Sequence, residues 1–396
     1  MTKAAATDHR LLQEITLRNV LSFGPQTATL PLENLNVLIG PNGSGKSNLI
    51  ETIALMRAAP GDMAAVIRRG GGVEEWLWKG KKTERAAIEL VLGNPNGVQP
   101  LRHIIELVAE NQRFQIADER IENKTSLEPD QAPITFYHFQ HKQIIRLNSE
   151  MNLILSGSRT ISPELSILAQ RRDPEIYPEI SYLADVYEKV RIYRDWAFGR
   201  NTIFREPQKT DARTDRLEED FSNLGLFLNR LRRTPKAKLS ILEGLRDLYD
   251  GITDFDISVE GATAQVFLTE GEFTIPATRL SDGTLRYLCL LAILCDPTPP
   301  PLICIEEPEL GLHPDILPKL ADRLVAVSNR TQLIVTTHSE ILVDALNEHP
   351  EFVVVCEKHN GQTEMNRLNK KELAEWLEDY RLGQLWTMGQ IGGTRW

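Results

Sequence analysis

Residues 40–47, Gly-Pro-Asn-Gly-Ser-Gly-Lys-Ser, fit the pattern GxxxxGK[ST] in full. In this pattern a glycine-rich loop wraps its backbone N–H groups around phosphate oxygens. The lysine, Lys46, would reach the β- and γ-phosphates of a nucleotide, and the Ser47 hydroxyl would ligate magnesium. A glycine-rich turn without a ligand is the alternative interpretation. The predicted contacts to the nucleotide are Gly40, Asn42, Gly43, Ser44, Gly45, Lys46, Ser47 and Asn48.

Two adjacent carboxylates, Glu306 and Glu307, follow the apolar run Leu-Ile-Cys-Ile. A magnesium ion held by Ser47 needs an acidic partner, and an attacking water needs a base or an orienting group. We therefore assign Glu306 to the metal and Glu307 to the water. Acidic residues are also frequent at strand ends and helix starts, where Glu309 could serve a following helix.

A third motif is the segment Leu280-Ser-Asp-Gly-Thr284, which opens an apolar helical run about 25 residues before the two glutamates. Ser281 can cap that helix, and capping alone would explain the motif. His338 stands at the end of a later strand-like run, "LIVTTHSE". A lone histidine in such a place is usually a packing or capping residue.

The elements that must position these residues alternate between strand and helix. "NLNVLIG" reads as a strand before the glycine-rich loop, and a helix should open at Gly45 and run through "KSNLIETIALMRAA". Near the C-terminus, "LRYLCLLAIL" and "HPDILPKLADRLVAVS" read as helices, and "PLICIE" and "TQLIVTTH" as strands. This alternation predicts a parallel sheet.

The rest of the chain predicts two further layers. Residues 85 to 145 carry strand-like runs separated by Pro, Asn, Asp and Gly, which indicates an antiparallel layer. Helical spacing then predicts a helical lobe, with Ile180, Leu183, Ala184, Tyr187 and Val190 on one helix and Phe221, Leu224, Leu228 and Leu231 on another. We therefore expect an N-terminal lobe at 1–150, a helical lobe at 151–250 and a C-terminal lobe at 251–396.

The order of these motifs resembles that of the ABC ATPases: Walker A at 40–47, signature motif at 280–284, Walker B at 302–307 and switch histidine at 338. The signature differs from LSGGQ by Asp282 in place of the first glycine and Thr284 in place of the glutamine. The resemblance implies that Ser281, Asp282 and Gly283 bind the γ-phosphate of a nucleotide held by another protomer. It also implies that Glu307, His338 and Lys46 are catalytic and that "ELGLHP" is the D-loop, with Glu309 where an Asp is more common.

Within this class, "GPNGSGKSNLIE", "LRNVLSFG" and "EEPELGLHP" resemble the RecF, SMC and OLD branch. The resemblance implies an α/β P-loop NTPase fold: an ABC-type ATPase head with a mixed central sheet, an antiparallel β layer and an inserted helical lobe. From this sequence, we expect neither the long coiled coil of an SMC rod nor an acidic nuclease domain after the ATPase, as in a full-length OLD nuclease. Gln140 and Gln143 are the candidates for the Q-loop ligand, although a place on a surface loop is the favoured interpretation of each.

The resemblance further implies an ATPase that uses ATP and Mg²⁺ in a homodimer, or in a higher oligomer built from it. We expect the sensor or regulatory subunit of a bacterial anti-phage defence system, controlling a separate effector such as a TOPRIM-type nuclease. The alternative is a RecF-like DNA-binding repair or genome-maintenance ATPase without a toxic partner. A transporter subunit fits the branch-specific motifs poorly.

Composition predicts a cytoplasmic protein. The 396 residues carry a net charge of −10, no run approaches the roughly 18 apolar residues of a membrane span, and the first residues lack the apolar core of a secretion signal. The four cysteines, Cys289, Cys295, Cys304 and Cys356, lie in apolar runs without CxxC spacing, so we interpret them as packing residues.

Three surfaces are candidates for partner contacts. Basic residues could follow a nucleic-acid backbone while aromatic residues stack on bases, although most such runs are solvated faces. The first cluster contains Trp76, Trp78, Lys79, Lys81, Lys82 and Arg85, and the second contains Arg230, Arg232, Arg233, Lys236 and Lys238. The third surface is the apolar tail, in which Leu385, Trp386, Met388, Ile391 and Trp396 either pack on their own subunit or dock a partner. We expect packing for Leu385 and Trp386 and keep docking as the hypothesis for Trp396.

Overall fold

The computed structural model describes residues 10–80, 83–95, 97–126, 132–140, 143–147, 153–155, 162–197, 199, 202, 203 and 205–393, with only the backbone at 143–147 and 153–155. The chain forms two compact units. Unit 1 comprises residues 1–190, 351–369 and 389–396, and unit 2 comprises residues 191–350 and 370–388.

The larger sheet of unit 1 is antiparallel throughout. Its strands are β1 (Leu12–Arg18), β2 (Leu30–Pro31), β4 (Arg85–Leu92), β5 (Leu101–Glu110), β6 (Arg113–Asn123), β7 (Thr135–Gln140), β8 (Gln143–Leu147) and β9 (Leu153–Leu155), in the order β2-β1-β4-β5-β6-β7-β8-β9. Burial alternates along β5, as expected for a strand with one covered face. The antiparallel layer predicted for residues 85 to 145 is thus confirmed.

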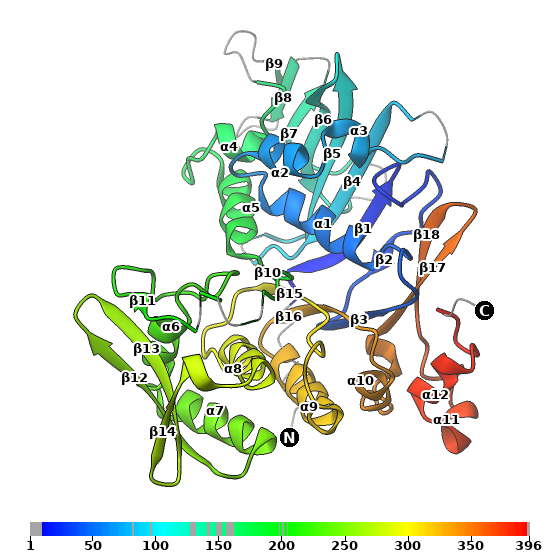
Figure 1. Ribbon diagram of the computed structural model, residues 1–396. Coiled ribbons are helices and arrows are strands. Elements are labelled where there is room, and N and C mark those ends of the chain that lie inside the picture. Colours follow the sequence, from blue (N-terminus) through cyan, green and yellow to red (C-terminus); the bar gives the residue numbers. More distant parts are fainter. Residues whose placement is uncertain are drawn as a thin grey trace, which may run out of the picture. The chain divides into compact units, whose positions relative to one another are not determined.

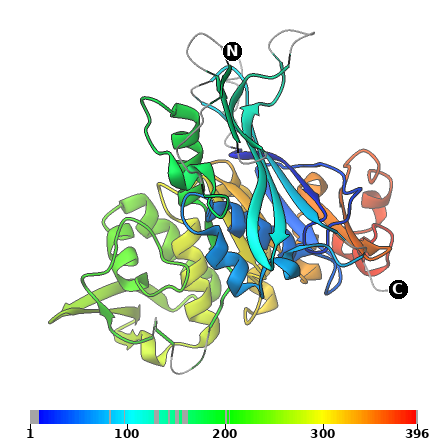
Figure 2. The same cartoon turned by 90° about the horizontal axis from the view of Figure 1, so that it is seen from above.

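Helices cover one face of this sheet. They are α1 (Lys46–Arg57), α2 (Met63–Arg69), α3 (Val73–Trp76), α4 (Ile167–Gln170) and α5 (Pro178–Lys189). Figures 1 and 2 show the helices of residues 46–76 along the strands β4 to β6, and α3 contacts β5. Unit 1 also holds β3 (Leu35–Ile39), which pairs in parallel with β17 (Val353–His359), and β17 pairs with β18 (Gln362–Arg367) in antiparallel fashion.

A buried polar cluster ties α4 and α5 to the antiparallel sheet. Glu119 on β6 accepts hydrogen bonds from the Ser166 hydroxyl and from the Ile167 N–H, the latter at 2.8 Å. Its carboxylate also lies 3.1 Å from His103 Nε2. His103 Nδ1 lies 3.0 Å from the Tyr187 hydroxyl on α5. Every polar atom named here has a partner, which is the condition for burying such groups without a large desolvation cost.

Unit 2 contains three parallel strands, a separate antiparallel sheet and several helices. The strands β10 (Arg191–Tyr193), β15 (Leu302–Glu306) and β16 (Gln332–Thr336) pair in parallel in that order. The strand β12 (Ile252–Glu260) pairs with β13 (Thr263–Glu270), which also pairs with β11 (Gln208–Lys209) and β14 (Phe273–Pro276). The helices are α6 (Leu224–Leu231), α7 (Pro235–Leu248), α8 (Asp282–Leu294), α9 (Leu317–Ser328), α10 (Glu340–Asp344), α11 (Trp376–Asp379) and α12 (Leu382–Thr387), with 3₁₀ turns at Ala277–Arg279 and Pro314–Ile316.

The helices predicted at 151–250 divide between the two units. In unit 1, α5 packs on α4 and α1. In unit 2, α6 and α7 pack against β12 and α8, as Figure 1 shows for the hairpin β12–β13. The structure therefore divides the chain differently from the three consecutive lobes that we expected. The physical reason is that these helices bury their apolar sides in two places: α5 packs on α4 and α1, whereas α6 and α7 pack on β12 and α8.

The strands and helices predicted around the motifs are confirmed. The helix after the glycine-rich loop begins at Lys46, and "LRYLCLLAIL" and "PLICIE" form α8 and β15. All four cysteines are buried and none forms a disulfide, and burial raises the pKa of the Cys356 thiol to about 12. No helix in the described part of the chain is long and apolar enough to cross a bilayer.

Candidate functional site: a phosphate-binding loop and an acidic strand end

The glycine-rich loop of unit 1 joins the buried strand β3 to α1. Three of its glycines have positive φ: Gly40 at 142°, Gly43 at 80° and Gly45 at 103°. A Cβ on Gly40 would also lie 2.1 Å from the carbonyl oxygen of Cys356. Only glycine adopts such a backbone without strain, so the loop shape depends on these three positions.

The loop directs polar groups inward. Lys46 Nζ donates to the carbonyl oxygens of Gly40 at 2.7 Å and Pro41 at 3.1 Å. The buried Ser44 Oγ has no hydrogen-bond partner among the described residues, and α1 starts without a side-chain cap. Uncapped N–H groups at a helix start and a lysine beside them are the donors that a phosphate group requires.

Two residues that the sequence did not single out support the loop. The Thr363 hydroxyl on β18 lies 2.9 Å from Ser44 O and 2.7 Å from Ser22 Oγ. Asn48 Nδ2 donates to Ser22 Oγ at 2.8 Å. Asn48, which we predicted to contact the nucleotide, thus forms a hydrogen bond with Ser22, one of the two residues that support the loop. Asn42 and Ser47 are exposed at the loop surface.

The acidic strand end of unit 2 has an unusual backbone. Glu307 follows β15 with φ of 45°, a conformation that costs a non-glycine residue on the order of 1 kcal/mol. Its N–H donates to Thr336 O on β16 at 2.9 Å, which continues the parallel pairing of Glu306 with Thr336 by one residue. Strained backbone of this kind concentrates at functional sites.

The structure brings Glu307 and His338 together. Glu307 Oε1 lies 3.6 Å from His338 Nε2, and both side chains are about one-third exposed. Since β15 and β16 are parallel neighbours, both residues leave the same edge of the sheet. A carboxylate and an imidazole at this separation can hold one water molecule and move its proton.

Glu309 organises the chain after β16. Its Oε1 accepts hydrogen bonds from the Thr337 hydroxyl at 2.8 Å and from the His338 N–H at 2.7 Å. Burial raises the pKa of the Glu309 carboxyl, and these two hydrogen bonds oppose the increase. Through this one carboxylate oxygen, Glu309 is bonded to the loop that carries His338.

The signature segment lies at the start of α8. Ser281 caps the helix by accepting from the Thr284 N–H at 3.1 Å, and its side chain is exposed. Asp282 pairs with Arg205, whose guanidinium also donates to Leu280 O at 2.7 Å and to Gly199 O at 2.8 Å. Arg205 thus compensates locally for an aspartate where the ABC signature has a glycine. A Cβ on Gly283 would lie 2.9 Å from Gly311 O, so the helix start closely approaches the loop after Glu309.

A groove of about 720 Å³ adjoins the signature segment within unit 2. Its walls include Ser281, Gly283 and Gly311 and the apolar side chains of Leu268 and Ile275. The exposed end of α8 is therefore accessible to another molecule.

The first basic cluster does not present aromatic rings to a nucleic acid. Trp76 is 1% exposed and Trp78 is 8% exposed, and Trp78 Nε1 donates to Gly361 O at 3.2 Å. The prediction that these rings could stack on bases was wrong, because both belong to the core of unit 1. Lys81 and Lys82 lie outside the described residues.

Three of the five cations of the second basic cluster are paired with acids. Arg230 pairs with Asp296, Arg232 with Asp256 and Lys238 with Asp254.

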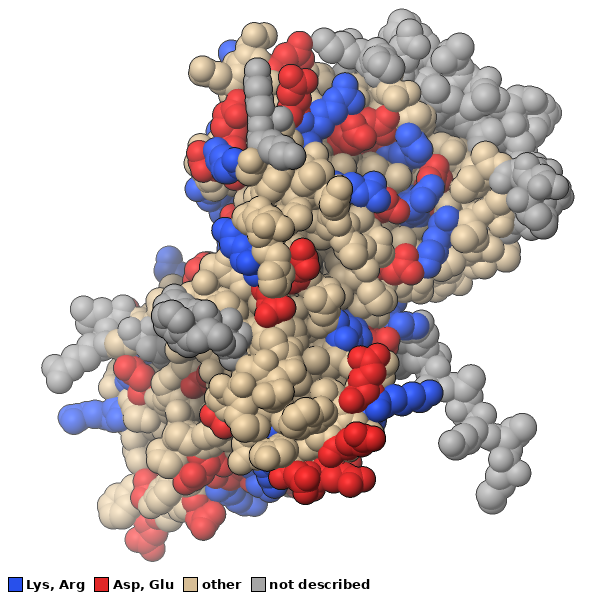
Figure 3. Space-filling view, turned by 90° about the vertical axis from the view of Figure 1, so that its right-hand side faces the viewer, with Lys and Arg blue, Asp and Glu red and all other residues tan. Residues whose placement is uncertain are grey.

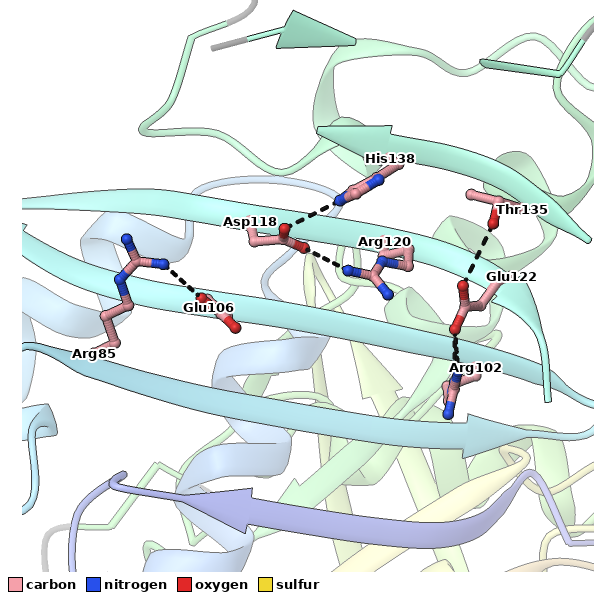
Figure 4. A network of polar contacts seen from close by, with 8 residues as sticks. All are labelled: Arg85, Arg102, Glu106, Asp118, Arg120, Glu122, Thr135 and His138. Atoms are coloured by element: carbon pink, nitrogen blue, oxygen red, sulfur yellow. Dashed lines mark hydrogen bonds and ion pairs between the residues drawn. The ribbon is translucent and has the colours of Figure 1, made fainter. Parts of the chain in front are cut away.

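The charged side chains on the antiparallel sheet also form pairs. Figure 4 shows a charge-balanced network in which Arg85 pairs with Glu106 at 3.1 Å and Arg102 donates to Glu122 at 2.8 Å. In the same network, Asp118 lies between Arg120 and His138. On the face in Figure 3, Lys and Arg side chains alternate with Asp and Glu, and acidic side chains gather in its lower part. The described residues on this face form no continuous basic surface for a phosphate backbone.

The C-terminal tail packs as expected for Leu385 and Trp386, which are 0% and 8% exposed. Its helix α12 is fixed to the end of α10 because the Gly383 N–H donates to Asp344 Oδ1 at 2.7 Å. Met388 is about half exposed, and Trp396 lies outside the described residues.

The fold and these motifs define an ABC-type P-loop NTPase. The chain belongs to the family described as "AAA domain, putative AbiEii toxin, Type IV TA system", whose model matches residues 35–344. It is similar to the crystal structure of the SmcHead bound to the C-winged helix domain of ScpA, with a TM-score of 0.58 and 13% identity over 92% of this chain and 99% of that chain. It is also similar to the Smc head domain with an extended coiled coil bound to the C-terminal domain of ScpA derived from Pyrococcus furiosus, with a TM-score of 0.56 and 13% identity over 93% and 99% of the two chains.

Two relatives share a shorter segment. The chromosome partition protein Smc of Desulfitobacterium hafniense (strain Y51) is 32% identical over 96 residues, which are 23% of this chain and 8% of that protein. The Smc protein of Thauera aminoaromatica is 33% identical over 90 residues, which are 22% of this chain and 7% of that protein. The chain therefore spans less than a tenth of the length of these relatives.

Proposed function

We propose that this protein binds and hydrolyses ATP and that ATP joins two copies of it. The observation that carries this proposal is the conformation of the glycine-rich loop. Three positive-φ glycines, an inward-pointing Lys46 and an uncapped helix start form a cradle for phosphate groups. Glu307 and His338 supply a pair of groups that can orient and deprotonate a water molecule.

The two side chains that the sequence predicts as metal ligands are suited to magnesium. Ser47 and Glu306 offer a hydroxyl and a carboxylate, the hard oxygen ligands that Mg²⁺ prefers. No group of three metal-binding side chains occurs within the described part of the chain. The remaining ligands would therefore be nucleotide oxygens and water, which is the usual arrangement for Mg²⁺ in nucleotide sites. When bound, the ion would neutralise charge on the β- and γ-phosphates.

The dimer is proposed from the exposed signature segment. Ser281 and the start of α8 are accessible, and a helix start attracts an anion. In this arrangement the γ-phosphate held by Lys46 of one copy would contact Ser281 of the second copy. ATP would then favour the closed dimer by its differential affinity for that state, and hydrolysis would reverse it.

We further propose that the dimer is the regulatory subunit of a bacterial anti-phage defence system that controls a separate effector. The family description names a toxin–antitoxin system, which supports a defence setting. The relatives named Smc support the alternative, a genome-maintenance ATPase acting on DNA. Acids pair with three of the five cations of the second basic cluster, which favours the defence role over the DNA-binding role.

ATP turnover by the purified protein tests the enzymatic part of the proposal. We expect phosphate release that requires Mg²⁺ and stops when EDTA removes the metal, because a triphosphate without its metal keeps its full charge. We also expect the mass measured by light scattering to double when ATP is bound. A protein that neither releases phosphate nor binds ATP would contradict the proposal.

Two measurements distinguish the defence role from the genome-maintenance role. Isolation of the tagged protein with the products of neighbouring genes, in the presence and absence of ATP, would support control of an effector. ATP-dependent affinity for DNA that falls steeply with salt would instead support the maintenance ATPase, since phosphate contacts release counterions.

A further inference from the structure

Arg286 is a charged residue on the otherwise apolar helix α8. It is 4% exposed and lies five residues after Ser281. Burial of a guanidinium is costly unless its N–H groups have acceptors. Nη2 of Arg286 donates to the main-chain oxygen of Glu307 at 2.7 Å. One end of the signature helix is thus joined to the backbone of the predicted catalytic glutamate.

Trp196 contacts the same segment from the other side. Its indole Nε1 donates to the main-chain oxygen of Glu306 at 2.7 Å. The Arg286 guanidinium carbon lies 4.3 Å from the centre of a Trp196 ring, a cation–π contact. Trp196 in turn stacks on Phe221 at 5.3 Å between ring centres. The main-chain carbonyl groups of Glu306 and Glu307 therefore accept hydrogen bonds from Trp196 and Arg286, and these two side chains also contact each other.

These contacts restrain the backbone of Glu307. Glu307 has a left-handed backbone, and its N–H is already bonded to Thr336 O. With Arg286 on the carbonyl oxygen, both sides of the Glu307 main chain are held. The direction of the carboxylate toward His338 depends on this backbone conformation, and catalytic groups displaced by about 1 Å can lose on the order of a hundredfold in rate. Burial lowers the pKa of Arg286 to about 10, so the side chain remains a cation near neutral pH.

We propose that Arg286, supported by the Trp196 ring, is a positioning residue for Glu307 and is needed for ATP turnover but not for ATP affinity. This inference rests on the function proposed above. In this proposal Arg286 acts through the main chain of Glu307 rather than on the nucleotide or the attacking water. Because α8 begins at the signature segment, the same contact links the position of Ser281 to that of Glu307.

Arg286→Lys tests the inference. Lysine keeps the charge but lacks the planar group that stacks on an indole while donating to a carbonyl. We expect kcat for ATP hydrolysis to fall at least about tenfold, with KM and the Kd for ATP within about twofold of wild type. Trp196→Phe keeps an aromatic ring under the guanidinium and removes the bond to Glu306, so a smaller fall, of about threefold or more, is expected.

Arg323→Lys is the matched control. Arg323 is partly buried. It pairs with Asp247 at 2.9 Å and donates to Ser240 O at 3.4 Å, and both of these partners lie on α7. We expect Arg323→Lys to lower the melting temperature about as much as Arg286→Lys and to leave kcat within about twofold of wild type. Equal kcat values for the two lysine variants would overturn the inference. Should Arg286→Lys fail to fold, wild-type kcat in Trp196→Phe would overturn it.

The outcomes also separate this inference from the proposed function. If wild type hydrolyses ATP and Glu307→Gln does not, while Arg286→Lys turns over as wild type does, only the positioning role is wrong. If wild type releases no more phosphate than Glu307→Gln, the ATPase proposal fails and the positioning role fails with it.

Discussion

Replacing Glu307 with glutamine will leave ATP bound and stop its hydrolysis. Glutamine has nearly the same shape as glutamate but cannot accept a proton from water at neutral pH, and a positioned general base contributes roughly 10² to 10⁴ to a rate. We expect kcat to fall by at least about a hundredfold, measured as phosphate release, while the Kd for ATP stays within about threefold. ATP should then hold the closed dimer, so light scattering should show a dimer that persists after excess nucleotide is removed.

Glu272→Gln is the control for this variant. Glu272 is exposed in the turn between β13 and β14 and carries the same charge change. Wild-type turnover is expected. If Glu307→Gln also hydrolysed ATP at the wild-type rate, Glu307 would have no role as base or orienting group, and the short distance to His338 would be structural only.

Replacing Lys46 with alanine will weaken nucleotide binding itself. The ammonium group that now contacts Gly40 O and Pro41 O would otherwise contact phosphate oxygens. Loss of a hydrogen bond to a charged group costs about 1.5 to 3 kcal/mol, which corresponds to a Kd for ATP about 10 to 100 times higher. Titration calorimetry measures this directly.

Lys319→Ala serves as its control, because Lys319 is an exposed lysine on α9. Its Kd for ATP should equal that of wild type. An unchanged Kd in Lys46→Ala would show that the lysine makes no phosphate contact, and the assignment of the loop as a nucleotide site would have to be withdrawn.

The phosphate-binding loop could be predicted from the sequence because its features are local. The motif that predicts the positive φ of Gly40, Gly43 and Gly45 and the helix starting at Lys46 is contiguous in the sequence. The same holds for Glu307 and His338, since apolar runs predict both strands and the edge where each ends.

The supporting residues could not be predicted, because their partners are distant in the sequence. Thr363 and Ser22 are 341 positions apart, Trp196 and Glu306 are 110 apart, and Arg205 and Asp282 are 77 apart. No motif connects such pairs. One signal was present for Arg286: a charged residue inside an apolar helix needs a partner, although the sequence does not say which.

The interpretation of Trp76 and Trp78 failed for a related reason. Their neighbourhood of lysines suggested a surface, but Trp78 meets Gly361, which is 283 positions away. Burial of an aromatic ring depends on strands that arrive from elsewhere in the chain, so local charge predicts it poorly.

An equimolar mixture of two variants, at an ATP concentration that fills the wild-type site but not that of Lys46→Ala, tests most directly the central claim that one ATP is shared by two copies. Lys46→Ala removes the phosphate contact in one copy, and Ser281→Arg blocks the signature segment in the other. In a mixed dimer, the loop of the Ser281→Arg copy faces the intact signature of the Lys46→Ala copy, so one complete site forms. Random pairing then predicts that turnover returns to about a quarter of the wild-type value, although each variant alone is inactive. A mixture as inactive as its components would contradict the account.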